Sequence, residues 1–204
     1  MTKLGGLGGV PIVSNTGTVV AFAGAIGSGK STLSTLVAQQ LGWFRVSFGD
    51  YVRDYAQEQG LDAADRAVLQ RVGQGLVLSN VGKFVQAVLA PARREGWEPG
   101  ANLIVDGVRH TEARWALREA VVPADLKLVY VTVDEVSRQR RAAREHEIDP
   151  RTLSRYDQHI AEAQVPRILR EYADLTVDNG LPPRLAVDQV IDRLQLKSRA
   201  MAAA

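Results

Sequence analysis

The stretch Gly24-Ala-Ile-Gly-Ser-Gly-Lys-Ser31 decides the fold of this chain, because it fits the pattern G-x-x-x-x-G-K-[ST] in full. It follows an apolar run at 19–23 and precedes an amphipathic stretch at 31–41. A strand, a glycine-rich turn and a helix in this order form a phosphate-binding loop. The sequence therefore predicts a polyphosphate site where a buried strand passes into a helix.

The residues of this loop suit the polyphosphate of ATP together with Mg²⁺. Glycines let successive backbone N–H groups point at the phosphates, and the helix that follows adds its positive amino-terminal end. We expect Lys30 to reach the β and γ phosphates, the Ser31 hydroxyl to bind Mg²⁺, and Thr32 to contact the α or β phosphate. The other loop residues expected to bind the nucleotide are Gly24, Gly27, Ser28 and Gly29.

Short apolar runs alternate with amphipathic stretches over the rest of the chain, which predicts a parallel sheet covered by helices on both faces. The expected strands are 19–23, 44–47, 103–105, 126–133 and 175–177. The expected helices are 31–41, 50–59, 63–72, 81–92, 112–120, 134–145, 153–172 and 184–196. The predicted fold class is α/β, with five parallel strands in a three-layer arrangement and right-handed crossovers.

Composition narrows the class of protein further. A chain of 204 residues, 46% hydrophobic and 24% charged, is long enough to form one domain with a real core. The absence of cysteine excludes a disulfide scaffold, thiolate metal sites and a cysteine nucleophile. A net charge of +2, with arginines scattered over several motifs, argues against a nucleic-acid-binding protein. No apolar run approaches the roughly 20 residues that span a bilayer, so we expect a soluble, cytoplasmic protein.

Five further segments are similar to motifs of P-loop nucleoside monophosphate kinases and their relatives. The segment 46–53 resembles the one after the second strand of adenylate kinases. The segment 103–109 resembles the third strand end of that family and, more closely, of bacteriophage deoxynucleoside monophosphate kinases, although the adenylate kinase proline is missing. The segments 133–144, 155–157 and 173–180 resemble the lid-hinge arginines, the second lid flank with Gln158 in place of an acidic residue, and the closing strand and loop of dephospho-coenzyme A kinases.

The resemblance covers residues 19 to about 196 and implies a strand order of 2-3-1-4-5. The segment 1–18 is glycine-rich and is expected to be flexible, and the kinase domain is expected at 19–204. Within this domain, 50–96 is expected to form a helical lobe over the acceptor. The connector 145–154 has neither a strand pattern nor metal-ligand cysteines, so it is expected to be a short lid.

Phosphoryl transfer explains the positions of several arginines, because two anionic molecules must be held in line while their charge is neutralised. Arg53 and Arg109 follow the second and third strands at one rim of a parallel sheet, so both can meet on the acceptor's phosphate. Arg140 and Arg144 lie four apart on one helix face and are expected to clamp the transferring group. The resemblance adds Arg155 as a substrate-binding residue. For each arginine the alternative is an ordinary solvated surface position.

Two carboxylates and one amide complete the predicted site. Asp106 at a strand end and Asp50 at a helix start are placed to hold Mg²⁺ through water or to orient a nucleophile, the alternative being that each only caps a helix. Asn179 is expected in a loop near the adenine, together with residues 141–144. The histidines share no ligand spacing and are interpreted as surface or structural residues; they are His110, His146 and His159.

These observations favour an ATP-dependent kinase that transfers the γ-phosphoryl group to a nucleoside monophosphate or a similar phosphate-bearing acceptor. A second hypothesis is transfer to a hydroxyl, as in dephospho-coenzyme A kinases, with Asp50 as general base; the chain lacks the Pro-Leu-Leu strand end of those kinases. A third is a regulatory P-loop ATPase with a macromolecular partner, which the lack of an Asn-Lys-x-Asp guanine signature weakens. The first hypothesis predicts a nucleotide donor and a small acceptor as partners, with no membrane or nucleic acid.

Overall fold

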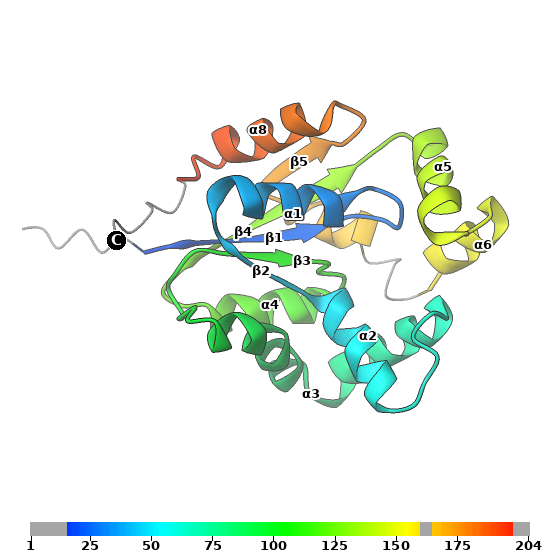
Figure 1. The fold of residues 1–204 in the computed structure, drawn as a ribbon, viewed down its shortest axis with the longest axis horizontal. Helices are drawn as coiled ribbons and strands as arrows, with labels where there is room; N and C mark the ends of the chain where they lie inside the picture. Colours follow the sequence, from blue (N-terminus) through cyan, green and yellow to red (C-terminus); the bar gives the residue numbers. More distant parts are fainter. Residues whose placement is uncertain (1–15, 160–164, 198–204) are drawn as a thin grey trace, which may run out of the picture.

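The computed structural model describes residues 16–159 and 165–197, with side chains except at 145, 146, 166 and 167. Its five strands form a sheet in the order β2-β3-β1-β4-β5, and every neighbouring pair is parallel (Figure 1). The strands are β1 (Thr18–Ala23), β2 (Phe44–Ser47), β3 (Leu103–Asp106), β4 (Asp125–Thr132) and β5 (Leu175–Asp178). The predicted fold class and strand order are confirmed. The segment expected to be flexible, 1–18, lies outside the described residues up to residue 15.

Two layers of helices cover the sheet. The helices α1 (Lys30–Leu41) and α8 (Pro183–Arg193) lie on one face, and α3 (Arg66–Arg94) and α4 (Thr111–Ala120) lie on the other (Figure 1). In the central strand β1, Val20 and Phe22 pack with the first layer, whereas Val19 and Ala21 pack with the second. Successive side chains of a strand point to opposite faces, so a strand buried on both faces is apolar throughout.

The helix α3 is two helical halves that meet at Asn80. Asn80 has extended backbone angles, φ −167° and ψ 92°, and its side-chain oxygen accepts a hydrogen bond of 2.8 Å from the backbone N–H of Lys83. This bond caps the second half. The expected helices 63–72 and 81–92 are therefore both present, but the first starts at Arg66 and runs on to the break.

The same helix corrects the expectation about apolar stretches. Among the described residues, α3 is long and apolar enough, by length and composition alone, to cross a membrane. In the fold its halves meet at an angle, and Phe84, Val85 and Leu89 are buried in the core beneath the sheet. Packing of its second half thus accounts for part of the apolar character of α3, while Leu78 is exposed.

Three helices gather at the carboxyl ends of the strands, at the right of Figure 1. They are α2 (Phe48–Glu58), α5 (Glu135–His146) and α6 (Pro150–Asp157). Each begins with a side-chain cap, since Ser47, Asp134 and Asp149 accept hydrogen bonds from backbone N–H groups of the first turn. Open α/β sheets bind their ligands at this edge, so these helices surround the candidate site.

Two expected elements differ from the structure. The connector 145–154 contains the end of α5 and the first part of α6, because Asp149 caps a helix that Pro150 opens. The expected helix 153–172 is not continuous: α6 ends at Asp157, residues 160–164 lie outside the described part, and a short π-helix, η1 (Val165–Leu169), follows. Pro166 lacks the N–H that a continuous α-helix requires at that position.

Candidate active site

The phosphate-binding loop has a backbone conformation that requires glycine at two positions. Gly27 and Gly29 have φ of 77° and 79°, in the left-handed region that L side chains rarely adopt. A Cβ atom at Gly27 would lie 2.7 Å from the carbonyl oxygen of Arg138, and one at Gly29 would collide with the side-chain amide of Asn179. Both the backbone angles and the close approach of neighbours therefore exclude a side chain there.

Three side chains bind the carbonyl groups of the loop from outside. Asn179 Nδ2 donates to the Ser28 carbonyl oxygen at 2.9 Å. Arg141 donates to the same oxygen at 3.3 Å and to the main-chain oxygen of Asn179 at 2.8 Å. Arg138 donates to the Ile26 carbonyl oxygen at 3.4 Å. Carbonyls held on the outer side leave the loop's N–H groups to face an anion on the inner side.

Lys30, the cation of the loop, lies among charges from other elements. Its side chain is only 7% exposed. Burial first, and then the positive charge of Arg109, lower the pKa of Lys30 from 10.5 to about 7; Asp106 raises this pKa and Arg66 lowers it further. Lys30 is therefore close enough to two arginines for their repulsion to matter. A phosphate bound here would offset that repulsion.

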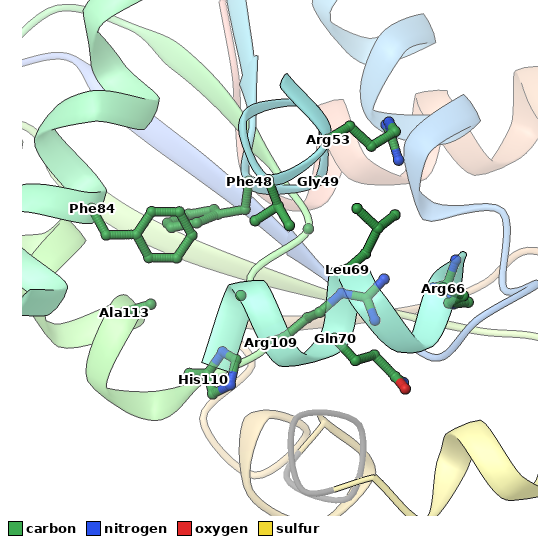
Figure 2. A pocket seen from close by; sticks show the side chains of 13 residues that line it. Phe48, Gly49, Arg53, Arg66, Leu69, Gln70, Phe84, Arg109, His110 and Ala113 are labelled. Carbon is green, nitrogen blue, oxygen red and sulfur yellow. The ribbon is translucent and has the colours of Figure 1, made fainter. Parts of the chain in front are cut away.

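A pocket beside the loop has three arginines along one side (Figure 2). Arg53 comes from α2, Arg66 from the first turn of α3, and Arg109 from the loop after β3. Burial first, and then Arg66, lower the pKa of Arg109 to about 9, with a further lowering by Arg53 that Asp106 opposes. Burial and Arg53 likewise lower the pKa of Arg66. Neighbouring guanidinium groups repel each other, and together they attract an anion such as a phosphate.

The other side of this pocket is apolar. The rings of Phe48 and Phe84 pack edge to face with centroids 5.2 Å apart. Figure 2 shows these rings and Ala113 on the side away from Arg53 and Arg66. A pocket with one cationic and one apolar side suits a guest that has an anionic end and an apolar body.

The carboxylates Asp106 and Asp50 are joined by Arg45 of β2, which the sequence analysis overlooked. Arg45 Nη2 donates to Asp106 Oδ2 at 2.7 Å, and Arg45 Nη1 lies 3.5 Å from Asp50 Oδ2. Arg53 pairs with the other oxygen of Asp50, and Arg45 Nε donates to Ser34 Oγ at 3.1 Å. A charged residue within an otherwise apolar buried strand was the sequence signal available, because such a charge needs a partner.

The helix-cap explanation of both carboxylates is wrong. Ser47 caps α2, and His110 occupies the cap position of α4. Asp106 is 3% exposed, and its Oδ1 atom is buried without a hydrogen-bond partner. An anionic oxygen of this kind fits Mg²⁺ or a water bound to it. Within the described ranges no three His, Asp or Glu side chains gather as metal ligands, so Ser31 and Asp106 would act together with nucleotide phosphates and water.

The arginines of α5 are divided between two sides of the helix. Arg138 and Arg141 face the phosphate-binding loop through the hydrogen bonds described above. Arg140 is exposed. Consecutive residues of an α-helix are about 100° apart around its axis, so Arg140 lies on nearly the opposite side of α5 from Arg138. Of the pair expected from the four-residue spacing, Arg144 lines a pocket beside Gly29, described next. A role for Arg140, or for the exposed Arg155 of α6, stays a prediction.

A second pocket adjoins Gly29. Its lining includes Thr32, Arg141, Arg144 and Asn179. Ser31 and Thr32, at the start of α1, are exposed. The sequence analysis expects the adenine near residues 141–144 and the loop of Asn179, so this pocket is the candidate for the base of the nucleotide. Of the residues predicted to bind the nucleotide, Gly29, Thr32 and Asn179 thus line one pocket.

Comparison with known proteins agrees with this geometry. A family model described as an AAA domain matches residues 20–164. A UPF0200 protein from Pyrobaculum aerophilum is 31% identical over 141 residues, which are 68% of this chain and 72% of that protein. A UPF0200 protein from Aeropyrum pernix is 33% identical over 102 residues, which are 50% of this chain and 52% of that protein.

Several solved structures share the fold. The APS kinase of Mycobacterium tuberculosis in complex with AMPPNP and APS has a TM-score of 0.59 at 18% identity, covering 89% of this chain and 99% of that chain. The shikimate kinase of Acinetobacter baumannii in complex with shikimate has a TM-score of 0.56 at 15% identity, covering 89% of this chain and 95% of that chain. The gluconokinase of Sinorhizobium meliloti has a TM-score of 0.55 at 19% identity, covering 88% of this chain and 92% of that chain. At such identities the likeness shows a common P-loop fold.

Proposed function

The chain belongs to the AAA domain family and to the family of the UPF0200 proteins, and from this premise we propose that it is an ATP-dependent kinase acting on a small, phosphate-bearing acceptor such as a nucleoside monophosphate. The observation that carries the proposal is the pocket lined by Arg53, Arg66 and Arg109 beside Lys30. Such a pocket supplies a second anion site next to the phosphate-binding loop, which a protein that only bound or hydrolysed ATP would not require.

The donor would occupy the loop at 24–32. Its β and γ phosphates would accept hydrogen bonds from backbone N–H groups and from Lys30, and its base would lie in the pocket lined by Arg141, Arg144 and Asn179. Mg²⁺, when bound, neutralises charge on the phosphates. Ser31 and Asp106 are the residues that would hold it.

The acceptor's phosphate would bind between Arg53, Arg66 and Arg109. One of its oxygens forms a bond to the γ phosphorus while the bond from that phosphorus to the β–γ bridging oxygen breaks, so ADP leaves. An ionised phosphate oxygen has no proton to lose, and no general base is needed. The arginines and Lys30 therefore act by orienting two anions and stabilising charge that builds up between them.

Transfer to a hydroxyl is the alternative, and the solved structures of shikimate kinase and gluconokinase belong to enzymes named for acceptors of that kind. It would require Asp50 to take a proton. Asp50 is paired with both Arg45 and Arg53. Each carboxylate oxygen of Asp50 already faces a guanidinium group, which competes with an acceptor hydroxyl for that oxygen. The geometry favours a phosphate acceptor for this reason.

A coupled assay tests the proposal directly. Purified protein with ATP and Mg²⁺ is supplied in turn with AMP, GMP, CMP, UMP and dTMP, and ADP formation is followed. We expect turnover with at least one monophosphate and its loss in Arg53→Ala. Hydrolysis of ATP that no acceptor stimulates, together with an unchanged rate in Arg53→Ala, would instead favour a regulatory ATPase.

A further inference from the structure

The apolar side of the arginine-lined pocket contains one polar side chain that the phosphate site does not use, His110. It is 6% exposed and lines the pocket, and Figure 2 shows it beside Ala113, away from Arg53 and Arg66. From the sequence this histidine was expected to be a surface or structural residue. Its position in the pocket makes it able to contact a guest.

Gln74 of α3 fixes the hydrogen-bonding state of this ring. His110 Nε2 lies 2.9 Å from the side-chain oxygen Oε1 of Gln74. An amide oxygen can only accept, so Nε2 carries the proton, and the Nδ1 atom of the neutral ring is left as a hydrogen-bond acceptor. Burial lowers the pKa of His110, which agrees with a neutral ring.

The other polar side chains of the pocket have different partners. Arg53, Arg66 and Arg109 form its cationic side. Gln70, 7% exposed, donates from Nε2 to the backbone carbonyl of Tyr156 in α6 at 3.3 Å. Among the residues that line this pocket, His110 is thus the polar side chain placed where the body of an acceptor, rather than its phosphate, would lie.

We propose that His110 is a specificity-determining residue whose Nδ1 accepts a hydrogen bond from an N–H or amino group on a nitrogen ring of the acceptor, with Gln74 as its positioning residue. The inference rests on the proposed function and adds that the acceptor's body is a heterocycle with a hydrogen-bond donor, lying near Phe48 and Phe84. A guest without the donor leaves the buried acceptor atom unpaired, and such guests bind less well.

The test compares acceptors with and without that donor. The monophosphate with the highest kcat/KM among AMP, GMP, CMP, UMP and dTMP is paired with its analogue lacking the donor. For AMP and CMP the analogues are purine riboside and pyrimidin-2-one riboside monophosphates. For UMP and dTMP they are the 3-methyl derivatives. GMP is paired with inosine monophosphate, which lacks the amino group, and with 1-methylguanosine monophosphate, which lacks the ring N–H. Wild type should prefer the natural acceptor by roughly tenfold, the effect of one hydrogen bond. In His110→Phe the preference should fall to less than about threefold, while binding of a nonhydrolysable ATP analogue stays unchanged.

Two further variants distinguish a role of His110 in recognising the acceptor's ring from a role in stabilising the fold. His110→Asn retains an acceptor atom and should recover part of the preference, and Gln74→Leu, which releases the imidazole, should lose part of it. Gln57→Leu, at an exposed position of α2, is the matched control. If His110→Phe does not fold by circular dichroism, the asparagine and Gln74 variants carry the test. An unchanged preference in these variants would overturn the role of His110 alone. Wild-type protein that phosphorylates no monophosphate would overturn the proposed function with it.

Discussion

The loop at 24–32 and the arginine-lined pocket would each hold a phosphate, but by different means. The loop uses main-chain N–H groups of consecutive residues, and side chains such as Asn179 and Arg141 bind its carbonyls from outside. The pocket uses Arg53, Arg66 and Arg109 from separate elements, and burial and mutual repulsion lower the pKa values of the last two. The loop is therefore preformed, whereas the pocket brings together positive charges that disfavour one another.

Lys30→Met should have the largest effect, because Lys30 belongs to the loop and its charge also interacts with Arg109 of the pocket. Methionine retains much of the side-chain length without the charge. We expect kcat to fall roughly 10²–10³-fold, the usual cost of losing one group that stabilises transition-state charge. Steady-state kinetics with the best acceptor measures this, and a loss of less than threefold would remove Lys30 from the mechanism.

Arg109→Ala should weaken use of the acceptor by the arginine-lined pocket and leave binding of ATP by the loop at 24–32 unchanged. The variant should lower kcat/KM for the acceptor by roughly 100-fold, because it removes one partner of a partly buried charged contact. The dissociation constant of a nonhydrolysable ATP analogue should change by less than about twofold. Arg118→Ala, at an exposed position of α4, is the control. Equal losses of donor and acceptor binding would show that the two regions are not separate.

Arg141→Ala should weaken binding of the nucleotide by the loop at 24–32. Arg141 binds the Ser28 carbonyl and the main chain of Asn179, so its loss should weaken binding of the ATP analogue by roughly tenfold through a less ordered loop. Arg140→Ala, one residue away but exposed, should change this affinity by less than about twofold. Calorimetric titration of both variants decides which arginine serves the loop, and the reverse order would restore the assignment made from the four-residue spacing.

Above neutral pH the protein should take up a proton when the nucleotide binds. The resulting pH dependence of affinity is the smallest of the expected effects. The pKa of Lys30 is about 7 in the free protein, and bound phosphates would raise it toward its ordinary value. Between these two values the free lysine is neutral and the bound lysine charged, so affinity falls as pH rises through this range. From pH 7 to pH 8 the affinity should fall about fivefold. Titration calorimetry in buffers of different ionisation enthalpy measures the uptake, and release of a proton would contradict it.

The sheet was predictable because its signals are local. Each of the five strands is a short apolar run between amphipathic stretches, and the predicted bounds of β2 agree with the structure at both ends. The order of the strands came from the family resemblance. The path after Asp157 was not predictable from periodicity, because Val165 and Leu169 are buried with the apolar spacing of an α-helix although they belong to a π-helix.

The site was predictable only in part. Gly24, Gly27 and Gly29 form a contiguous pattern, and the structure places them in one loop. The hydrogen bond from Arg45 to Asp106 joins residues 61 positions apart, a contact that only the pairing of β2 with β3 creates. The four-residue spacing of Arg140 and Arg144 predicted a shared helix face, and of the two the structure shows Arg144 in the pocket beside Gly29.

The amino-acid sequence by itself determined that a strand, a glycine loop and a helix would form a phosphate site, because backbone conformation there depends on residues adjacent in the chain. Only the tertiary structure decided which charged side chains surround a second anion. Arg66 and His110 carry no distinguishing pattern, and they acquire their positions from the packing of α3 against α2, α4 and the edge strand β2. Distance in space, rather than along the chain, sets the electrostatic energy that defines such a pocket.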